Sequence, residues 1–197
     1  MSFLTEFLRS PLTVGAVAPS SSGLARVAVA PVPRAADAVV VELGAGTGAF
    51  TGPIQQRLGG RGRHVVIEIN ERFAQRLARR YPAVEVVVAD AADLGAVLVD
   101  RGIGRADVIV SGLPWAAFAP DHQRDVLAAA TEALAADGVF TTFAYVHARW
   151  APPARRLHRA LESRFDEVVT GRTVWANLPP ALVYHCRRPV PAALQLV

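Results

Sequence analysis

The stretch VVELGAGTGAF, residues 40–50, constrains the fold of this chain more than any other part of its sequence. A run of β-branched residues leads directly into three glycines, Gly44, Gly46 and Gly48. Glycine has no Cβ atom, so it allows tight turns and lets the backbone come close to a ligand. In open parallel sheets the turn between a strand and the next helix binds nucleotides in this way. The stretch therefore predicts an α/β fold with a ligand at this turn.

Strand-like and helix-like segments alternate along the rest of the chain. β-branched and alternating runs predict strands at 38–43, 64–69, 84–88, 106–110, 139–146, 167–174 and 181–187. Apolar residues at helical spacing predict one helix that begins near residue 23 and four more at 55–58, 71–80, 121–136 and 153–165. This order predicts a Rossmann-like, seven-stranded, mostly parallel sheet with helices on both faces.

The composition suits one domain with a core of its own, covering 1–197. Hydrophobic residues make up 52% of the chain and charged residues 19%, which provides enough apolar surface for a single core. No apolar run reaches the roughly 18 residues that span a bilayer, and no secretory signal is expected. Cys186 is the only cysteine, so disulfides are not expected and a cytoplasmic location fits.

The charge of the chain favours anionic partners. The formal net charge is +4 and the sequence pI is near 10.2. Nucleic acid and anionic lipid surfaces both attract such a protein. A solvated surface rich in arginine explains the charge equally well, so the charge alone does not choose among these interpretations.

The glycine turn leaves the type of nucleotide open. Gly44, Gly46 and Ala49 also satisfy the dinucleotide pattern G-x-G-x-x-A, and an acid after the second strand suits NAD as well. Glu68 stands at that strand end, where its carboxylate can accept hydrogen bonds from both ribose hydroxyls. The sequence offers no histidine paired with an acid for hydride transfer, which disfavours a dehydrogenase. Glu42, two residues before the first glycine, makes the turn more similar to S-adenosylmethionine sites.

Three further motifs sharpen that similarity. They are VGAVAPSS at 14–21, SGLPW at 111–115 and VWANLPPA at 174–181. Together with ELGAGTG at 42–48, they resemble the bacterial phospholipid N-methyltransferases that act on phosphatidylethanolamine, which are relatives of the ribosomal RNA adenine dimethyltransferases. The resemblance implies a class I methyltransferase fold and S-adenosylmethionine as the cofactor. It also implies methyl transfer to the primary amine of a lipid head group.

The resemblance assigns the cofactor site to the ends of successive strands. Glu68 is expected to bind the ribose, and Asp90 the adenine amino group, although helix capping would also explain either acid. The N-terminal segment 1–30 is expected to be helical and to cover the methionine end of the cofactor. The expected cofactor-binding residues are Ser20, Ser21, Glu42, Gly44, Ala45, Gly46, Thr47, Gly48, Glu68, Ile69, Asp90, Ala91, Ser111 and Gly112. No metal site is expected.

Three aromatic residues are candidates for the amine site. Trp115 and Tyr145 follow the fourth strand and end the fifth, and an aromatic face attracts a methylated ammonium by about 0.5 to 2 kcal/mol. Packing beneath a loop is the alternative role for Trp115. His147 is a candidate proton acceptor or phosphate contact, with a plain surface position as the alternative.

The chain departs from the adenine enzymes at Ser111, where they carry Asn or Asp to orient an aromatic amino group. Base methylation is therefore not expected, and nucleic acid is not an expected partner. Two other functions stay open. The chain could be a soluble methyltransferase for a small molecule or RNA adenine, or it could bind S-adenosylmethionine without catalysis.

Two segments suit a membrane surface. Phe3, Leu4, Phe7 and Leu8 share one face of a short amphipathic helix. The predicted helix at 153–165 places arginines opposite its apolar face, and each basic residue near an anionic membrane contributes about 1 kcal/mol. Solvation of the helix is the alternative. We expect peripheral contact with the inner face of the cytoplasmic membrane, with a phospholipid as the substrate.

Overall fold

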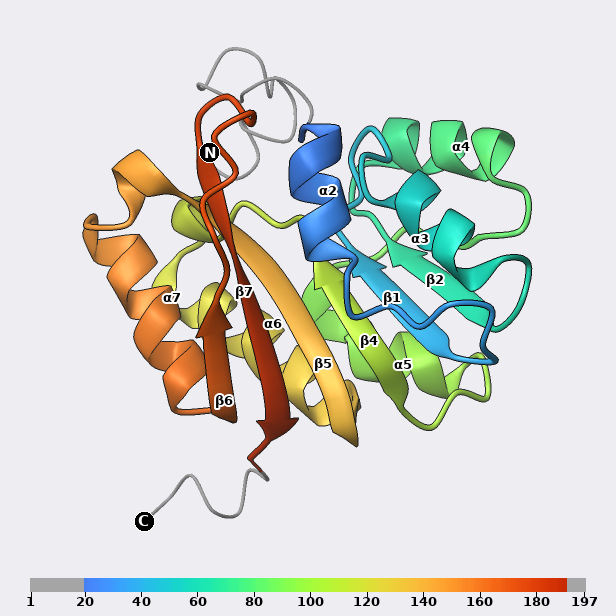
Figure 1. Ribbon diagram of the computed structural model, residues 1–197. Coiled ribbons are helices and arrows are strands. Elements are labelled where there is room, and N and C mark those ends of the chain that lie inside the picture. The colour runs from blue at the N-terminus through green and yellow to red at the C-terminus, as the bar shows by residue number, and fades with distance from the viewer. Residues whose placement is uncertain (1–19, 191–197) are drawn as a thin grey trace.

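The centre of the sheet is built from the β-branched run that precedes the glycine turn. This run forms strand β1 (Val39–Leu43), which pairs in parallel with β2 on one side and β4 on the other. The structure, a computed structural model, describes residues 20–190, and its strands follow the order β3-β2-β1-β4-β5-β7-β6 (Figure 1). The other strands are β2 (Arg63–Ile67), β3 (Glu85–Val87), β4 (Ala106–Ser111), β5 (Leu134–Tyr145), β6 (Phe165–Thr170) and β7 (Ala181–Pro189). Only β7 runs antiparallel to its neighbours β5 and β6, which confirms the predicted mostly parallel sheet.

Helices cover both faces of this sheet (Figure 1). Helices α2 and α3 pack on one face, and α5, α6 and α7 pack on the other. Their bounds are α2 (Ser22–Ala28), α3 (Thr51–Leu58), α4 (Glu71–Arg80), α5 (Leu94–Val99), α6 (Pro120–Ala133) and α7 (Pro152–Glu162). Short 3-10 turns lie at Ala91–Asp93, Trp115–Ala117 and Val146–Ala148.

Local sequence explains where several helices begin and end. The Asn70 side chain accepts the backbone N–H groups of Arg72 and Phe73 and so caps α4. Gly59 ends α3 in the left-handed conformation, with φ of 61°. A proline stands in the first turn of α6 and of α7, where no N–H is needed.

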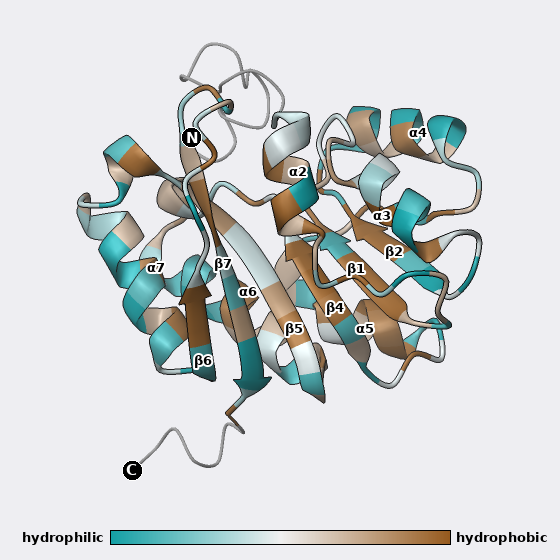
Figure 2. Cartoon of the chain, in the orientation of Figure 1, coloured by the Kyte–Doolittle hydropathy of each residue, from teal (hydrophilic) through white to brown (hydrophobic). Residues whose placement is uncertain are grey.

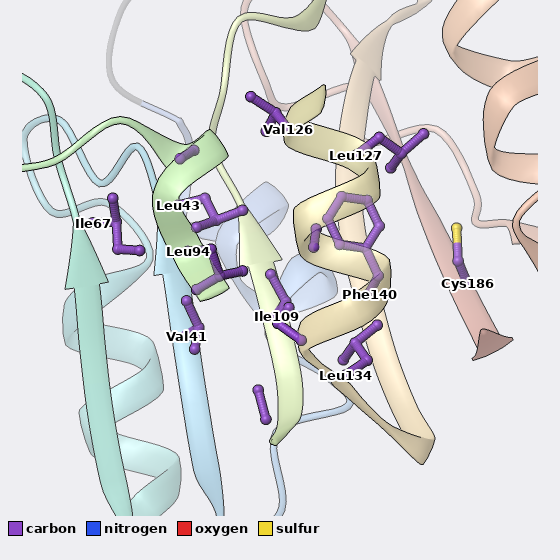
Figure 3. Packing of buried hydrophobic residues seen from close by; sticks show 14 of the residues in the cluster. Val41, Leu43, Ile67, Leu94, Ile109, Val126, Leu127, Leu134, Phe140 and Cys186 are labelled. Atoms are coloured by element: carbon purple, nitrogen blue, oxygen red, sulfur yellow. The ribbon is translucent and has the colours of Figure 1, made fainter. Parts of the chain in front are cut away.

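The core consists of two layers because side chains alternate across each strand. Val41, Leu43 and Ile109 point towards α5 and α6, where Figure 3 shows them beside Leu94 and Phe140. Figure 2 shows the apolar residues gathered on the central strands, with hydrophilic residues frequent on α4 and α7. Each fully buried aliphatic side chain contributes about 1.5 to 3 kcal/mol to folding, so these layers hold the strand ends in fixed positions.

The opposite layer joins the same strands to the N-terminal helices. Val40, Val108 and Val110 contribute to a second buried cluster with residues of α2 and α3. Because β1 and β4 are packed on both faces, the positions of the two turns that follow these strands are fixed.

Some boundaries differ from the predicted ones. Helix α6 ends at Ala133 and β5 already begins at Leu134, four residues before the Gly138 that was expected to end the helix. Phe165 starts strand β6 and does not end the preceding helix. Helix α5 was not predicted, because LGAVLV is short and apolar throughout and has no polar face to reveal a helical period.

The predicted membrane segment at Phe3–Leu8 and residues 14–19 of the N-terminal motif lie outside the described residues. Of the segment 1–30, the structure describes α2 and the residues that flank it. Between residues 20 and 190, no helix has the length and apolar character needed to cross a bilayer.

Candidate functional site

Two turns meet where the chain order in the sheet reverses, between β1 and β4. In open α/β sheets, ligands bind at this point, beyond the carboxyl ends of the strands. The Gly112 N–H donates to the Leu43 carbonyl at 2.8 Å, and a Cβ atom on Gly112 would lie 2.7 Å from the Gly44 carbonyl oxygen. A Cβ on Gly44 would lie 2.7 Å from Leu113 Cδ2. Glycine at both positions therefore lets the turns after β1 and β4 touch.

The three glycines of the first turn have positive φ angles of 68°, 54° and 86° at Gly44, Gly46 and Gly48. All three N–H groups have acceptors within the protein: the Ile67 carbonyl, the Glu68 carboxylate and the Ala45 carbonyl, respectively. These three N–H groups are therefore bonded within the protein, and the positive φ angles explain why glycine stands at each position. The predicted contacts of the three glycines with a cofactor stay predictions.

Gly46 leaves space on the outer side of the turn. A Cβ atom built there has no heavy atom within 4 Å. The neighbouring Thr47 is exposed, whereas Ala45 is buried against helix α4 in the cluster with Leu77. A ligand can therefore approach the backbone at Gly46 more closely than any side chain would permit.

Glu68 lies directly after β2 and reaches across to this turn. Its Oε2 accepts the Gly46 N–H at 2.8 Å, and its Oε1 accepts the Asn70 N–H at 2.9 Å. Burial raises the pKa of the Glu68 carboxyl above its ordinary value, and the two backbone hydrogen bonds oppose that rise. Each carboxylate oxygen can accept a second hydrogen bond. The geometry therefore fits the predicted ribose contact, which stays a prediction.

Asp90 caps the 3-10 turn at Ala91–Asp93 by accepting the Ala92 N–H at 2.9 Å. Its Oδ1 also lies 3.6 Å from His122 Nε2, and a third of its side chain is exposed. Ile69 and Val88, which follow β2 and β3, are 43% and 52% exposed. An aromatic base would find apolar surface beside an acceptor here, so a capping role does not conflict with the predicted adenine contact.

Glu42 is fully buried below the glycine turn. Its Oε2 accepts the Thr51 hydroxyl at 2.8 Å and lies 3.3 Å from His64 Nε2, and His64 Nδ1 lies 3.0 Å from Gln55 Nε2. Glu42 Oε1 is buried with no partner among the described residues. A buried carboxylate oxygen normally has a donor, so Glu42 Oε1 has acceptor capacity that the described residues leave unused. Between residues 20 and 190, no cluster of His, Cys, Asp or Glu side chains could hold a metal ion.

The loop after β4 places Trp115 in the core. The indole is 3% exposed, packs edge-on against Phe118 and Phe140, and donates its N–H to the Ser111 hydroxyl at 3.1 Å. The Trp115 carbonyl in turn accepts the Gln123 side-chain N–H at 3.0 Å. The predicted role of Trp115 as a wall of the amine site is therefore corrected, since its ring stabilises the loop from below. Ser111 is also buried, and its hydroxyl stabilises this loop by accepting the Trp115 indole N–H.

A row of aromatic rings begins beside the glycine turn and ends at the surface. Phe50 meets Phe143 edge-on at 6.1 Å, Phe143 meets Tyr145 at 5.6 Å, and Tyr145 stacks on His147 at 5.9 Å. Phe50 is buried, Phe143 and Tyr145 are half-buried, and His147 is exposed. Burial raises the pKa of the Tyr145 hydroxyl, so it stays protonated at neutral pH. This row places aromatic faces between the glycine turn and the surface, and the predicted amine contact of Tyr145 stays a prediction.

Ser21 has a structural role at the start of α2. Its side chain accepts the Leu24 N–H at 3.2 Å and caps α2. Its backbone N–H donates to the Asn177 side chain at 2.9 Å. The predicted cofactor contacts of Ser20 and Ser21 stay predictions.

Sequence reasoning missed Leu113, His64 and Phe143. The alternation of Phe143 and Tyr145 with smaller residues was a visible signal that two rings share one face of β5, and His147 follows in the 3-10 turn after that strand. The contact of His64 with Glu42 had no such signal, because it depends on the pairing of Val40 with His64 across two strands.

Comparison with known sequences places the chain in one family. Residues 40–138 match the methyltransferase domain family. The chain is 37% identical over 191 residues to an ornithine lipid N-methyltransferase of Singulisphaera acidiphila, with 94% of each chain covered.

Solved structures share the fold. The N-methyltransferase NodS from Bradyrhizobium japonicum matches with a TM-score of 0.61 at 16% identity and covers 95% of this chain and 97% of its own. An S-adenosylmethionine-dependent O-methyltransferase from Thermotoga maritima matches with a TM-score of 0.56 at 16% identity, over 82% of this chain and 64% of its own. At these identities the likeness concerns the fold alone.

Proposed function

The chain belongs to the S-adenosylmethionine-dependent methyltransferases, and on this premise we propose that it methylates the amine nitrogen of a lipid head group. The observation that carries the proposal is the aromatic row from Phe50 to His147, which leads from the cofactor turn to the surface. The similarity to an ornithine lipid N-methyltransferase supports a lipid acceptor. The sequence motifs support phosphatidylethanolamine or its methylated derivatives. Both head groups present an alkylamine.

The residues at the carboxyl ends of β1 and β2 fit the cofactor. Glu68 would hold the ribose hydroxyls, and the open backbone at Gly46 would lie beside the adenosyl group. Glu42 Oε1, buried without a partner, would accept a donor from the methionine end. When bound, S-adenosylmethionine supplies a methyl group that its sulfonium has already activated.

The work left to the protein is mainly orientation. The amine nitrogen must approach the methyl carbon in line with the carbon–sulfur bond, so that one bond forms as the other breaks. Fixing reactants in such a geometry can lower a barrier by roughly 7 to 11 kcal/mol. The Tyr145 ring would hold the amine through its negative face, since each methylated product stays cationic.

The amine must lose a proton before or during transfer. An alkylammonium with a pKa of about 10.4 is protonated at neutral pH and has no free lone pair. Tyr145 is itself protonated there, because burial raises its pKa. This leaves His147, whose ring stacks on Tyr145 at 5.9 Å, or a water that leads to bulk solvent, as the acceptor of that proton.

A lipid acceptor requires contact with a membrane. The proposal therefore includes peripheral binding to an anionic membrane surface, from the cytoplasmic side. Support comes from the excess of basic residues in the chain and from the polar face of α7, where Arg155 and Arg159 are exposed.

The test supplies purified protein with radiolabelled S-adenosylmethionine and vesicles that contain either phosphatidylethanolamine or ornithine lipid. Label is expected in the lipid fraction, as mono-, di- or trimethylated head groups. The same reaction is run with free ethanolamine and with RNA. Label in RNA or in the free amine, but in neither lipid, would contradict the proposal and favour a soluble methyltransferase. Tight cofactor binding by calorimetry without any turnover would favour a binding protein without catalysis.

A further inference from the structure

Three large apolar side chains are more than two-thirds exposed at the end of the sheet that carries the aromatic row. Trp150 is 70% exposed, Trp175 is 74% exposed and Leu178 is 75% exposed. Exposed tryptophans are uncommon on a monomer surface without a binding role, because each indole leaves a large apolar area in water. This set requires an explanation that the cofactor site does not provide.

These side chains come from two segments that leave the sheet together. Tyr145 at the end of β5 pairs with Ala181 at the start of β7, and the Val146 N–H donates to the Pro180 carbonyl at 2.9 Å. One segment continues through Trp150 into α7. The other is the loop at 171–180 between β6 and β7, which lies in Figure 1 at the same end of the sheet as the start of α7.

The loop holds its apolar residues outward in a defined conformation. Asn177 is 3% exposed, donates to the Pro179 carbonyl at 2.7 Å and accepts the Ser21 N–H at 2.9 Å. Val174 forms a bridge with Ala181. Trp175 and Leu178 flank this buried anchor, so their exposure follows from how the loop is pinned.

The charge around these side chains has one sign. The segments 143–161 and 171–181 contain five arginines and no Asp or Glu. Of the five, Arg149, Arg155, Arg159 and Arg172 are exposed, and the first two and Arg172 lie nearest to the exposed indoles in the sequence. The Arg149 guanidinium lies 4.3 Å from the centre of the Trp150 ring, which places a cation beside an indole at the surface.

From this combination we propose that Trp150, Trp175 and Leu178, with Arg149, Arg155 and Arg172, form a docking face for an anionic lipid bilayer. Indoles favour the boundary between head groups and acyl chains, and arginines bind anionic head groups. A nucleic acid would match the arginines but leave Leu178 without a partner. The inference rests on the proposed function, which it deepens: the face lies at the end of the strand that carries Tyr145, so a docked head group would have a short path to the amine site.

The test measures binding to vesicles by sedimentation, with phosphatidylcholine vesicles that contain or lack phosphatidylglycerol. Wild type is expected to bind the anionic vesicles. The double variant Trp175→Ser with Leu178→Ser should bind on the order of tenfold or more weakly, because apolar contact with the acyl region is lost. The triple variant Arg149→Gln, Arg155→Gln and Arg172→Gln should lose about fivefold for each arginine.

Matched controls lie near the start of β4, at the opposite end of the strands. Val99 is 75% exposed at the end of α5, and Arg105 is exposed just before β4. Val99→Ser and Arg105→Gln should bind vesicles like wild type. Melting temperature and cofactor affinity are followed in every variant, to show that the exposed substitutions leave the fold intact.

Tryptophan fluorescence gives a second readout. Trp115 is buried and should contribute a constant signal, whereas Trp150 and Trp175 should shift to shorter wavelength on anionic vesicles. The shift should shrink in Trp150→Phe and in Trp175→Phe. Three outcomes would each contradict the docking face. Wild type could fail to bind vesicles, the face variants could bind as well as the controls, or the fluorescence spectrum could stay unshifted.

Activity on lipid dispersed in detergent micelles separates this inference from the proposed function. If the protein methylates lipid in micelles but the substitutions in the docking face leave vesicle binding unchanged, the docking face is contradicted and the proposed function is not. If vesicle binding depends on the docking face but no lipid is methylated, the proposed function is contradicted and the docking face is not.

Discussion

The two halves of the site are assembled over very different distances in the chain. In the cofactor half, Thr51 reaches Glu42 nine residues away and Gly46 reaches Glu68 over 22 residues. In the proposed acceptor half, Phe50 after the glycine turn meets Phe143 on β5. One strand-helix-strand unit therefore supplies these contacts of the first half, whereas the second half also needs β5, which lies beyond β4 in the sheet.

The halves also differ in what they leave open. The polar groups of the cofactor half are mostly bonded within the protein, the backbone at Gly46 is open, and one buried oxygen of Glu42 has no partner among the described residues. The acceptor half instead presents rings, from Phe143 to His147, and exposed indoles beyond them. Under the proposed function, the polar half would bind the cofactor and the aromatic half would bind the acceptor.

The largest effect is expected where the turns after β1 and β4 touch. Gly112→Ala places a Cβ 2.7 Å from the Gly44 carbonyl oxygen, so backbone must move. We expect a loss of about 1 to 3 kcal/mol in the free energy of unfolding, measured in urea, and weaker cofactor binding by calorimetry. Gly95→Ala is the control, because its Cβ meets nothing within 4 Å and alanine favours a helix. Equal stability of the two variants would show that the turns are not in contact.

The next effect tests the cofactor half alone. Glu68→Ala removes the carboxylate expected to accept both ribose hydroxyls. Hydrogen bonds to a charged group contribute about 1.5 to 3 kcal/mol, so cofactor affinity should fall by roughly 10- to 100-fold. Asp93→Asn, an exposed acid nearby, should bind like wild type in the same calorimetric titration. Unchanged affinity in Glu68→Ala would remove the ribose assignment.

A smaller effect is expected in the acceptor half. Tyr145→Leu removes an aromatic face that attracts a cation by about 0.5 to 2 kcal/mol, so kcat/KM for the lipid should fall by roughly 2- to 30-fold. Cofactor affinity should not change. Tyr145→Phe keeps the ring and should stay close to wild type. If the phenylalanine variant loses as much as the leucine variant, the hydroxyl matters and the ring face does not.

The smallest effect concerns pH and again separates the halves. Burial raises the Glu68 pKa above 4.5 in the folded protein, so the folded state holds this proton to a higher pH than the unfolded state does. The corresponding stabilisation is present at low pH and is lost as pH rises through the raised pKa. Glu68→Gln lacks this loss, so its free energy of unfolding relative to wild type should increase with pH from 4.5 upward.

Denaturation of both proteins across this range measures the trend, and a constant difference would contradict it. In wild type, cofactor affinity should also decline as pH falls through the raised pKa, because a protonated carboxyl accepts fewer hydrogen bonds. Tyr145→Phe should not alter that decline.

The parts of the molecule that the sequence predicted are those with a local signal. The run at 39–43 and the glycines that follow predicted the central strand and its turn, because β-branching and missing Cβ atoms act within a few residues. The capping role of Ser21 was predictable for the same reason. Helix α5 was not, since an apolar segment of six residues carries no period.

Most strands and helices and the glycine turn could be predicted from the sequence, because each depends on neighbours in the chain. The burial of Trp115, the acceptor of the Gly46 N–H and the contact of Phe50 with Phe143 became known only from the fold. Those outcomes depend on which side chains from distant strands compete for the same buried space. Close packing allows only one arrangement of these side chains, and a pattern of neighbouring residues does not reveal which one.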